Sequence, residues 1–375
     1  MPPKAHAVLS ASAADRWIHC PKSARLSELY EDKGSDFAAE GTDAHALCEY
    51  KLLSLLGRET EDPTENLTWF NQEMVDCAEG YAGYVMELVE TAKTCCADPV
   101  VLVEQRVDFS RWVEQGFGTA DCVIIADGTL QICDYKHGRG VEVSAEENPQ
   151  MMCYALGALE IFDAIYDIDT VSMTIYQPRR CNISTYVISK DDLYRWADEV
   201  LKPAAELAFA GDGNFLCGEW CTFCKAKNDC RARAEANLKL AEYEFKLPPL
   251  LTDEDIEEIL GKLDDLVAWA SDIKEYALQQ AVNGKHWSGW KLVEGRSNRK
   301  YVNEDVVAAK VSEAGFDPYE HKVLGITAMQ KLLGRTRFEE LLAGYIEKPA
   351  GKPTLVPADD KRPEMITAAA DFENI

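Results

Sequence analysis

The stretch over residues 116–154 constrains this 375-residue chain most, because it combines a hairpin signal with clustered charged residues. It predicts two strands joined at residues 126–128, since the Asp-Gly pair tolerates the positive φ that a hairpin turn needs. Asp121 stands near the start of the first strand, and the second strand ends in Asp134 and Lys136. Asp134 and Lys136 are two residues apart, so they project from the same face. The sequence therefore predicts two carboxylates and a lysine that converge at one strand end.

This predicted convergence suits a hydrolytic Mg²⁺ or Mn²⁺ site. Carboxylate oxygens are hard ligands for such a cation. The bound metal polarises a phosphoryl oxygen and generates hydroxide, while a lysine orients the water or stabilises the developing charge. Solvent-facing charges are the alternative, and they are the usual reading of an isolated D-x-K motif. Here the apolar runs CVII and LQIC place both acids next to the core, and the Gly-Thr-Ala before Asp121 allows a close approach of chain segments.

Two of the predicted helices carry polar side chains that would suit the same site. Gln150 and Tyr154 share one helical face, from which they could hydrogen-bond a phosphate or hold a nucleic-acid strand. A surface glutamine beside a half-buried tyrosine is the alternative. His45, one turn before Glu49, could complete a site whose other ligands are carboxylates. A lone histidine is usually structural, and the sequence leaves both interpretations of His45 open.

The motif with the most specific spacing in the chain is a cluster of cysteines, Cys221-x₂-Cys224-x₅-Cys230. Three thiols within ten residues indicate a metal site, with Cys217 or a distant cysteine as the fourth ligand. Zinc and an iron–sulfur cluster both accept four cysteines, so both stay open here. Five of the 13 cysteines stand singly in apolar segments and are predicted to be small core residues: Cys48, Cys77, Cys122, Cys133 and Cys153.

The net charge of −26 argues against broad nucleic-acid binding, because phosphate contacts need Lys and Arg. A local basic groove is still compatible with it, since charge matters where the ligand sits. No apolar run reaches the length of a membrane span, and the N-terminus lacks the apolar centre of a secretory signal. We therefore expect a cytoplasmic protein with no membrane association. The oligomeric state cannot be predicted from these features.

The order of predicted elements is three strands, a helix, two strands and a helix, which indicates an α/β core with a mixed central sheet. Helices are predicted upstream at residues 43–57 and 66–97, with a loop at 31–42. Further helices are predicted at residues 192–211, 252–283, 303–314 and 326–346. We expect a core domain at 1–245, a mainly helical region at 250–346 and a loosely ordered tail at 347–375.

Residues 285–301 are locally basic and aromatic in a chain that is otherwise acidic. They contain Trp287 and Trp290 among five Lys or Arg residues. Such a stretch could contact a DNA backbone and stack bases. A β-hairpin with a solvated face is the alternative, and it is slightly favoured.

These motifs resemble a known group of enzymes. The segments GTAD, D-Y-K and Q-x₃-Y resemble the PD-(D/E)xK nuclease superfamily, and within it the RecB/Cas4-like branch that includes the AddB nuclease domain. The G-T-x-x-H segment around His45 is similar to the N-terminal histidine motif of that branch, and C-x₂-C-x₅-C is similar to its iron–sulfur ligands. This resemblance covers roughly residues 15–235. Over nearly the whole chain, segments such as LSASAADRWIHCPKSARL and GWKLVEGRSNRKY also resemble DUF2800, a family of uncharacterised phage and prophage proteins.

The superfamily resemblance implies a role for each residue of the motifs. Asp121 and Asp134 would bind Mg²⁺ or Mn²⁺ together with His45 and the backbone carbonyl of Tyr135, and Lys136 would be the catalytic lysine. The DNA-contacting residues would be Gln150 and Tyr154. The ligands of a 4Fe–4S cluster, which would staple the N-terminal segment to the end of the core, would be Cys20, Cys221, Cys224 and Cys230. Cys217 is then left over, and whether it or Cys20 is the fourth ligand stays open.

The fold implied by the resemblance is a restriction-endonuclease-like core, and the implied activity is metal-dependent hydrolysis of DNA phosphodiester bonds. An exonuclease acting on single strands or ends, in phage recombination or DNA processing, is expected. The alternative is a non-catalytic module that keeps the fold and the cluster and serves in phage recombination or replication as a DNA-binding or assembly partner. The intact Asp–Asp–Lys set argues against that alternative, because a site that has lost its catalytic role has no reason to keep all three residues.

Overall fold

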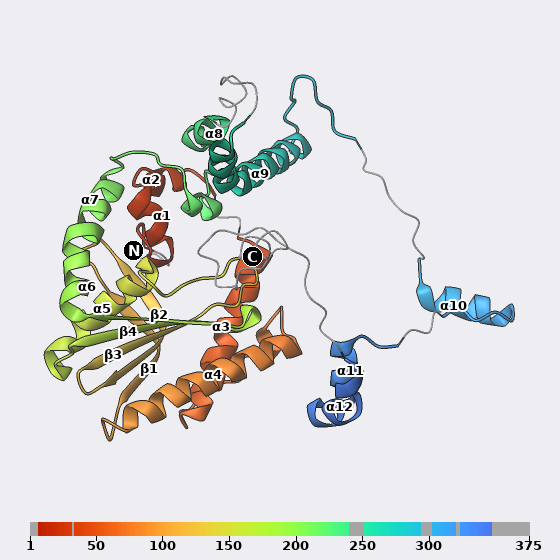
Figure 1. Ribbon diagram of the computed structural model, residues 1–375, viewed down its shortest axis with the longest axis horizontal. Helices are drawn as coiled ribbons and strands as arrows, with labels where there is room; N and C mark the ends of the chain where they lie inside the picture. Colours follow the sequence, from red (N-terminus) through yellow and green to blue (C-terminus); the bar gives the residue numbers. More distant parts are fainter. Residues whose placement is uncertain (1–6, 32–33, 240–250, 294–301, 320–322, 347–375) are drawn as a thin grey trace, which may run out of the picture. The chain divides into compact units, whose positions relative to one another are not determined.

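A mixed sheet of five strands organises the part of the chain that contains the predicted hairpin (Figure 1). The strands lie in the order β1 (Val100–Asp108), β2 (Phe117–Ala126), β3 (Thr129–Tyr135), β4 (Thr170–Gln177) and β5 (Asn182–Ser189). Neighbouring strands are antiparallel, except that β3 and β4 are parallel. A parallel pair needs a crossover, which helix α5 (Pro149–Tyr166) supplies. The prediction of an α/β core with a mixed central sheet flanked by helices is confirmed.

The structure is a computed structural model that describes residues 7–31, 34–239, 251–293, 302–319 and 323–346. The chain divides into two units, residues 1–279 and 280–375. The first unit contains the sheet, its covering helices, α8 (Arg231–Leu238) and nearly all of α9 (Asp253–Val282). The second unit contains α10 (Glu304–Glu313), α11 (Ile326–Leu333), α12 (Arg335–Leu342) and the short turn η7 (Ala343–Tyr345).

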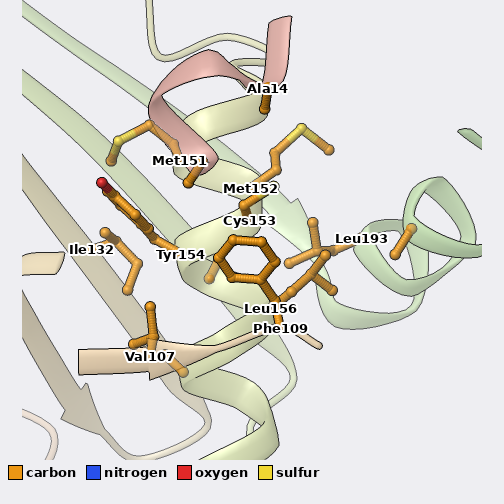
Figure 2. Packing of buried hydrophobic residues seen from close by; sticks show 14 of the residues in the cluster. Ala14, Val107, Phe109, Ile132, Met151, Met152, Cys153, Tyr154, Leu156 and Leu193 are labelled. Carbon is orange, nitrogen blue, oxygen red and sulfur yellow. The ribbon is translucent and has the colours of Figure 1, made fainter. Parts of the chain in front are cut away.

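One face of the sheet is buried under α5, which shares a hydrophobic cluster with strand residues such as Val107 and Ile132 (Figure 2). Asn148 caps α5 by accepting hydrogen bonds from the backbone N–H groups of Gln150 and Met151, and Pro149 occupies the first turn. The N-terminal segment joins this cluster through buried residues that include Trp17. Its elements are η1 (Ala11–Ala13), α1 (Ala14–His19) and α2 (Ser23–Ser27).

The predicted helix at 192–211 forms as α6 (Lys190–Trp196), a π-helical turn η4 (Ala197–Leu201) and α7 (Lys202–Ala210). Leu193, Leu201 and Ala208 of this run are buried in the same cluster as α5. Further short turns in the described part of the first unit are η2 (Thr64–Asn66), η3 (Pro178–Arg180) and η5 (Glu219–Phe223).

The opposite face of the sheet is covered by α3 (Asp36–Leu55) and α4 (Gln72–Lys93). The prediction that α3 begins at Asp43 was wrong. The Ser35 side chain accepts a hydrogen bond from the Ala38 backbone N–H and caps the helix seven residues earlier, so most of the predicted loop at 31–42 is helical. Helix α4 is shorter than predicted, because Asn71 caps it by accepting from the Met74 N–H. All five cysteines predicted to be core residues are buried, which confirms that prediction.

Part of the basic aromatic stretch is described, and those residues, 285–293, are irregular, with a turn at 288–289 and no strand. Lys285 lies over the ring of Trp287, with its Nζ atom 4.1 Å from the ring centroid. The rest of that stretch, residues 294–301, and the predicted tail at 347–375 lie outside the described residues. Within the described part of the chain, no helix is both long enough and apolar enough to cross a membrane.

Candidate acidic site and cysteine pocket

The predicted acids meet where strands β2 and β3 separate. Asp121 lies in the middle of β2 rather than near its start. Backbone pairing between the two strands ends at Cys122 and Cys133, which places Asp121 opposite Asp134. There the Oδ2 atom of Asp121 accepts a hydrogen bond of 2.7 Å from the backbone N–H of Tyr135. The carboxylate thus takes the place of a backbone acceptor, and this fixes its orientation at the opening between the strands.

Lys136 joins Asp134 to the helix that covers it. Its Nζ atom is 2.9 Å from Asp134 Oδ2 and donates a hydrogen bond of 3.0 Å to Gln150 Oε1. Gln150 Nε2 in turn donates to Tyr154 Oη at 3.1 Å and to Asp134 Oδ1 at 3.4 Å. Asp134 is only 2 % exposed, and this burial raises its pKa despite the opposing effect of Lys136. The structure therefore brings together the two acids, the lysine and the glutamine–tyrosine pair.

Tyr154 reaches this position because a glycine leaves room for its ring. A Cβ atom added at Gly118 would lie 2.6 Å from Tyr154 Cε1, closer than packed atoms approach. Gly118 belongs to the Gly-Thr-Ala segment before Asp121, so the expected close approach of chain segments there is confirmed.

His45 reaches the same place from α3, on the other side of the sheet. Its Nδ1 atom is 3.3 Å from Asp121 Oδ1. Burial disfavours the charged imidazole, but the carboxylates of Asp121, Asp134 and Glu104 outweigh burial and raise the pKa of His45 to about 9. The imidazole acts as a counter-charge for the acids in the metal-free protein.

Glu104 is a member of the site that the sequence reasoning missed. Ligand atoms of His45, Glu104 and Asp121 all lie within 4.8 Å of one another, the one such group among the described residues. Asp134 is not part of this group. Burial and the neighbouring carboxylate of Asp121 raise the pKa of Glu104 to about 7. The available signal was an acid inside the apolar strand VVLVEQRVDF, directly before the hairpin.

A local break in strand alternation lets side chains from both faces meet at this point. Val103 packs toward α3 and α4, yet Val107, four residues on, packs toward α5. On β2, Ala120 packs toward α5, while Cys122, two residues on, packs toward α3 and α4. Residues an even number apart in a regular strand share one face, so both strands change their facing between these residues.

Glu104 and Asp121 are the residues at which the facing changes. The register places them opposite each other, between the pairs Val103–Cys122 and Gln105–Ala120. Glu104 has a φ of 50°, a left-handed conformation that is unfavourable for a residue with a Cβ atom. The irregularity allows His45 and the residues on the α5 side to reach the same acids.

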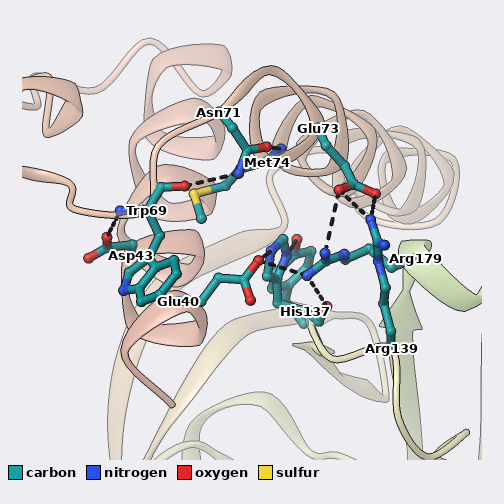
Figure 3. A network of polar contacts seen from close by, with 10 residues as sticks. Glu40, Asp43, Trp69, Asn71, Glu73, Met74, His137, Arg139 and Arg179 are labelled. Carbon is teal, nitrogen blue, oxygen red and sulfur yellow. Dashed lines mark hydrogen bonds and ion pairs between the residues drawn. The ribbon is translucent and has the colours of Figure 1, made fainter. Parts of the chain in front are cut away.

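The loop after Lys136 forms a charged network beside the site (Figure 3). Tyr135 Oη lies 2.7 Å from His137 Nδ1, and His137 Nε2 lies 3.4 Å from Glu40 Oε1. Arg179 donates to Glu40 at 2.9 Å, and Glu73 pairs with both Arg179 and Arg139. Because Glu40 and His45 are both on α3, this network fastens the helix that carries His45 to the end of β3.

A buried amide on β4 anchors the same loop. Gln177 Nε2 donates to the carbonyls of Gly138 and Val141 at 3.0 and 2.8 Å, and its Oε1 accepts from the Val143 N–H at 3.2 Å. The side chain of Gln177 thereby satisfies three backbone groups of a loop that has no regular structure.

The predicted cluster ligands frame one pocket at the end of the core. Its lining includes Cys20, Cys221, Cys224 and Cys230, but not Cys217. The space between the lining residues, counted together with the part open to solvent, is about 340 Å³. Cys20 Sγ accepts a hydrogen bond of 3.4 Å from the Leu216 backbone N–H. A hydrogen bond from Cys217 lowers the pKa of Cys221 to about 6.

Contacts between distant segments hold this pocket together. His19 and Trp220, each directly before a pocket cysteine, stack with ring centroids 4.3 Å apart and planes 6° apart. Arg25 Nε donates to the Phe209 carbonyl at 2.7 Å. Three cations, Arg16, Lys227 and Arg233, line the pocket beside the cysteines. The N-terminal segment is thus docked beside η5 by its own side chains.

The chain belongs to the family described as "Protein of unknown function (DUF2800)", whose model matches residues 6–363. This confirms the narrower of the two resemblances in the sequence. Among solved structures, the chain is similar to one described as "Crystal structure of SSO0001". The two are 14 % identical, the match covers 50 % of this chain and 95 % of that chain, and the TM-score is 0.23.

Proposed function

We propose that this member of the DUF2800 family is a divalent-cation-dependent nuclease that hydrolyses DNA phosphodiester bonds. In this proposal the five-stranded core is restriction-endonuclease-like, and the enzyme works as an exonuclease on single strands or ends, in phage DNA processing. The observation that carries it is the meeting of Glu104, Asp121 and His45, next to the Asp134–Lys136 pair at the end of β3. The finer assignment rests on the motif resemblance.

The donor set suits Mg²⁺ or Mn²⁺. Glu104 and Asp121 offer carboxylate oxygens and His45 offers one nitrogen, all within 4.8 Å of one another. The like charges of Glu104 and Asp121 lie close together in a partly buried place, which a divalent cation would relieve. When bound, such a cation supplies Lewis-acid activation of water and of a phosphoryl oxygen. Asp134 and the Tyr135 carbonyl stay the predicted further ligands.

Lys136 is the residue best placed to act on the reacting phosphate. Asp134 and Gln150 hold its ammonium group from two sides, so the cation is fixed next to the acids instead of moving in solvent. From there it can donate a hydrogen bond to a phosphate oxygen or orient the attacking water. Gln150 and Tyr154, which are hydrogen-bonded to each other, give the first turns of α5 a polar face toward the substrate strand.

The cysteine pocket supports a 4Fe–4S cluster better than it supports zinc. Zinc–sulfur bonds of about 2.3 Å in a tetrahedron place sulfurs roughly 4 Å apart. No three cysteine sulfurs in the described chain come within 4.8 Å of one another. The four cysteines instead surround a pocket with three cations in its wall, which suits a larger, anionic cluster. Because Cys20 lines the pocket and Cys217 does not, Cys20 is our proposed fourth ligand.

A cleavage assay tests the nuclease proposal. Labelled single- and double-stranded DNA is incubated with the full chain and Mn²⁺, and the wild type is compared with Asp134→Asn and Lys136→Met. We expect metal-dependent cleavage by the wild type and a loss on the order of 10²- to 10⁴-fold in both variants. Glu160→Gln, which changes an exposed ion pair with Arg111, is the matched control and should keep full activity.

The opposite results would favour the non-catalytic alternative. If the wild type cleaves neither substrate with Mn²⁺ or Mg²⁺, the enzyme proposal is wrong. Undiminished cleavage by Asp134→Asn would show that the activity comes from elsewhere. The cluster proposal is tested separately by anaerobic purification, which should give a brown protein absorbing near ~400 nm. A colourless anaerobic preparation with stoichiometric zinc would overturn it.

A further inference from the structure

The segment that carries two of the pocket cysteines is tied to helix α9, which lies beyond the predicted core domain. Lys227, between Cys224 and Cys230, has its Nζ atom 2.9 Å from Asp272 Oδ1. Arg233, just after Cys230, has its Nη1 atom 2.5 Å from Asp272 Oδ2. One carboxylate of α9 therefore holds two cations of the cysteine segment. We call these three side chains, Lys227, Arg233 and Asp272, the α9 clamp.

Arg233 is the buried centre of the α9 clamp. It is only 5 % exposed, and its Nη1 atom also donates to the Lys227 carbonyl at 3.2 Å. Its own carbonyl accepts a hydrogen bond of 2.9 Å from Asn237 Nδ2, which fixes the first turns of α8. Hydrogen bonds from Arg233 and Lys227 outweigh the effect of burial and lower the pKa of Asp272, so its carboxylate is charged at neutral pH.

The α9 clamp acts on the wall of the pocket. Lys227 and Arg233 both line the pocket together with Cys224 and Cys230. Cys230 is also the residue directly before α8, and its carbonyl accepts the Ala234 N–H at 3.1 Å. A shift of Arg233 therefore moves the start of α8 and the cysteine next to it.

The N-terminal part of the chain also contacts the same segment. Tyr30 Oη donates a hydrogen bond of 2.6 Å to Asp229 Oδ1. The loop between Cys224 and Cys230 thus contacts both the segment after α2 and helix α9. Without Asp272, the buried guanidinium of Arg233 would lose the carboxylate with which it pairs, and an uncompensated buried charge is costly.

We infer that Asp272 is a positioning residue for the cysteine site: through Lys227 and Arg233, helix α9 keeps Cys224 and Cys230 at the positions from which they hold the cluster. The inference rests on the cluster of the proposed function. It gives α9 a role in retaining the cofactor, since a loosened loop opens the pocket to solvent and to competing ligands. Loss of α9 would therefore release iron without any change in the acidic site.

The retention of a reconstituted cluster tests this role. Wild type, Asp272→Asn and Asp264→Asn are reconstituted anaerobically with iron and sulfide, and absorbance near ~400 nm is followed after a chelator is added. We expect Asp272→Asn to lose the absorbance and the bound iron about tenfold faster than the wild type. Asp264→Asn, an exposed acid on the same helix, should match the wild type. Equal retention in Asp272→Asn and the wild type would overturn the inference.

A second measurement keeps the test independent of the cluster. Thiol labelling of the metal-free proteins, resolved by mass spectrometry, should be faster at Cys224 and Cys230 in Asp272→Asn, with the exposed Cys95 as an internal reference. Lys227→Gln removes one arm of the α9 clamp without exposing Arg233 and should show a smaller change in the same direction. If the wild type takes up no iron, the cluster proposal fails, and labelling alone decides whether the α9 clamp exists. Unchanged labelling in both variants would show that it does not.

Discussion

The acidic site and the cysteine pocket lie in the same unit but are held in different ways. The acidic site is built on strands: Asp121 accepts a hydrogen bond from the backbone of β3, and Glu104 faces it from β1. The cysteine pocket is built on loops and helix ends. There a ring stack joins His19 to Trp220, and ion pairs join Lys227 and Arg233 to Asp272 of α9. Strand pairing joins the segments of the first region, whereas contacts of side chains join the segments of the second.

Because of this difference, the acidic site can hold like charges and a strained backbone, whereas the pocket depends on attraction between opposite charges. The sheet holds two like charges and a left-handed Glu104 in place, because the surrounding ladder leaves them no other conformation. The pocket has no such frame and relies on opposite charges, such as Asp272 between Lys227 and Arg233. We expect the acidic site to keep its shape without metal, and the pocket to depend on its clamps. Three changes test this contrast.

The largest effect is expected from Glu104→Gln, which removes a charge that the sheet holds under repulsion. We expect Mn²⁺ binding to weaken by about 10- to 100-fold, as for other changes around a metal site, measured by calorimetry. The metal-free protein should become more stable by about 1–3 kcal/mol at pH 8. The pKa of Glu104 is higher in the folded than in the unfolded protein. Glu104 therefore does not lower the free energy of unfolding below its unfolded pKa of 4.5, but it lowers it increasingly as the pH rises toward about 7.

The stabilisation by Glu104→Gln should therefore fade as the pH is lowered from 8 to 4, which urea unfolding in the presence of chelator would measure. Glu114→Gln, an exposed acid outside the site, is the control. If Glu104→Gln destabilises the protein at pH 8, the charge of Glu104 does not destabilise the folded state. The proposed difference between the two regions would then be wrong.

A smaller effect is expected from Gln177→Ala, which removes the buried anchor of the loop after Lys136. Three backbone groups would lose their partners, at a cost of about 1–3 kcal/mol if they stay buried. The loop should instead open to water, so that hydrogen exchange speeds up over residues 138–145 while the strands stay protected. Exchange that also rises in β2 and β3 would show that the sheet depends on this loop.

The smallest effect is expected from Trp220→Leu, which removes the stack with His19 beside the pocket. The stack should contribute about 0.5–1.5 kcal/mol beyond its buried area. We expect faster thiol labelling at Cys20 and Cys221 and unchanged Mn²⁺ binding at the acidic site. Weaker Mn²⁺ binding in this variant would show that the acidic site and the cysteine pocket are coupled, and would contradict the view that they are held independently.

The central sheet could be predicted because its signals are local. The Asp-Gly turn, the apolar runs and the Pro149 start of α5 each lie within a few residues, and all of them appear in the structure. The start of α3 could not be predicted in this way, because the helix cap at Ser35 outweighs the glycine that suggested a loop. Asp121 was placed too early in its strand, since β2 extends back to Phe117 to pair with β1.

The sequence by itself determined the motifs whose members are close together: the acid–spacer–lysine end of β3, the glutamine–tyrosine face of α5 and the three spaced cysteines. Spacing decides these, because strand and helix periods fix which neighbours share a face. Only the tertiary structure decided that His45 and Glu104 meet Asp121, that Cys20 rather than Cys217 lines the pocket, and that Asp272 joins it. Such meetings depend on a break in strand alternation and on the packing of distant helices, which no local pattern encodes.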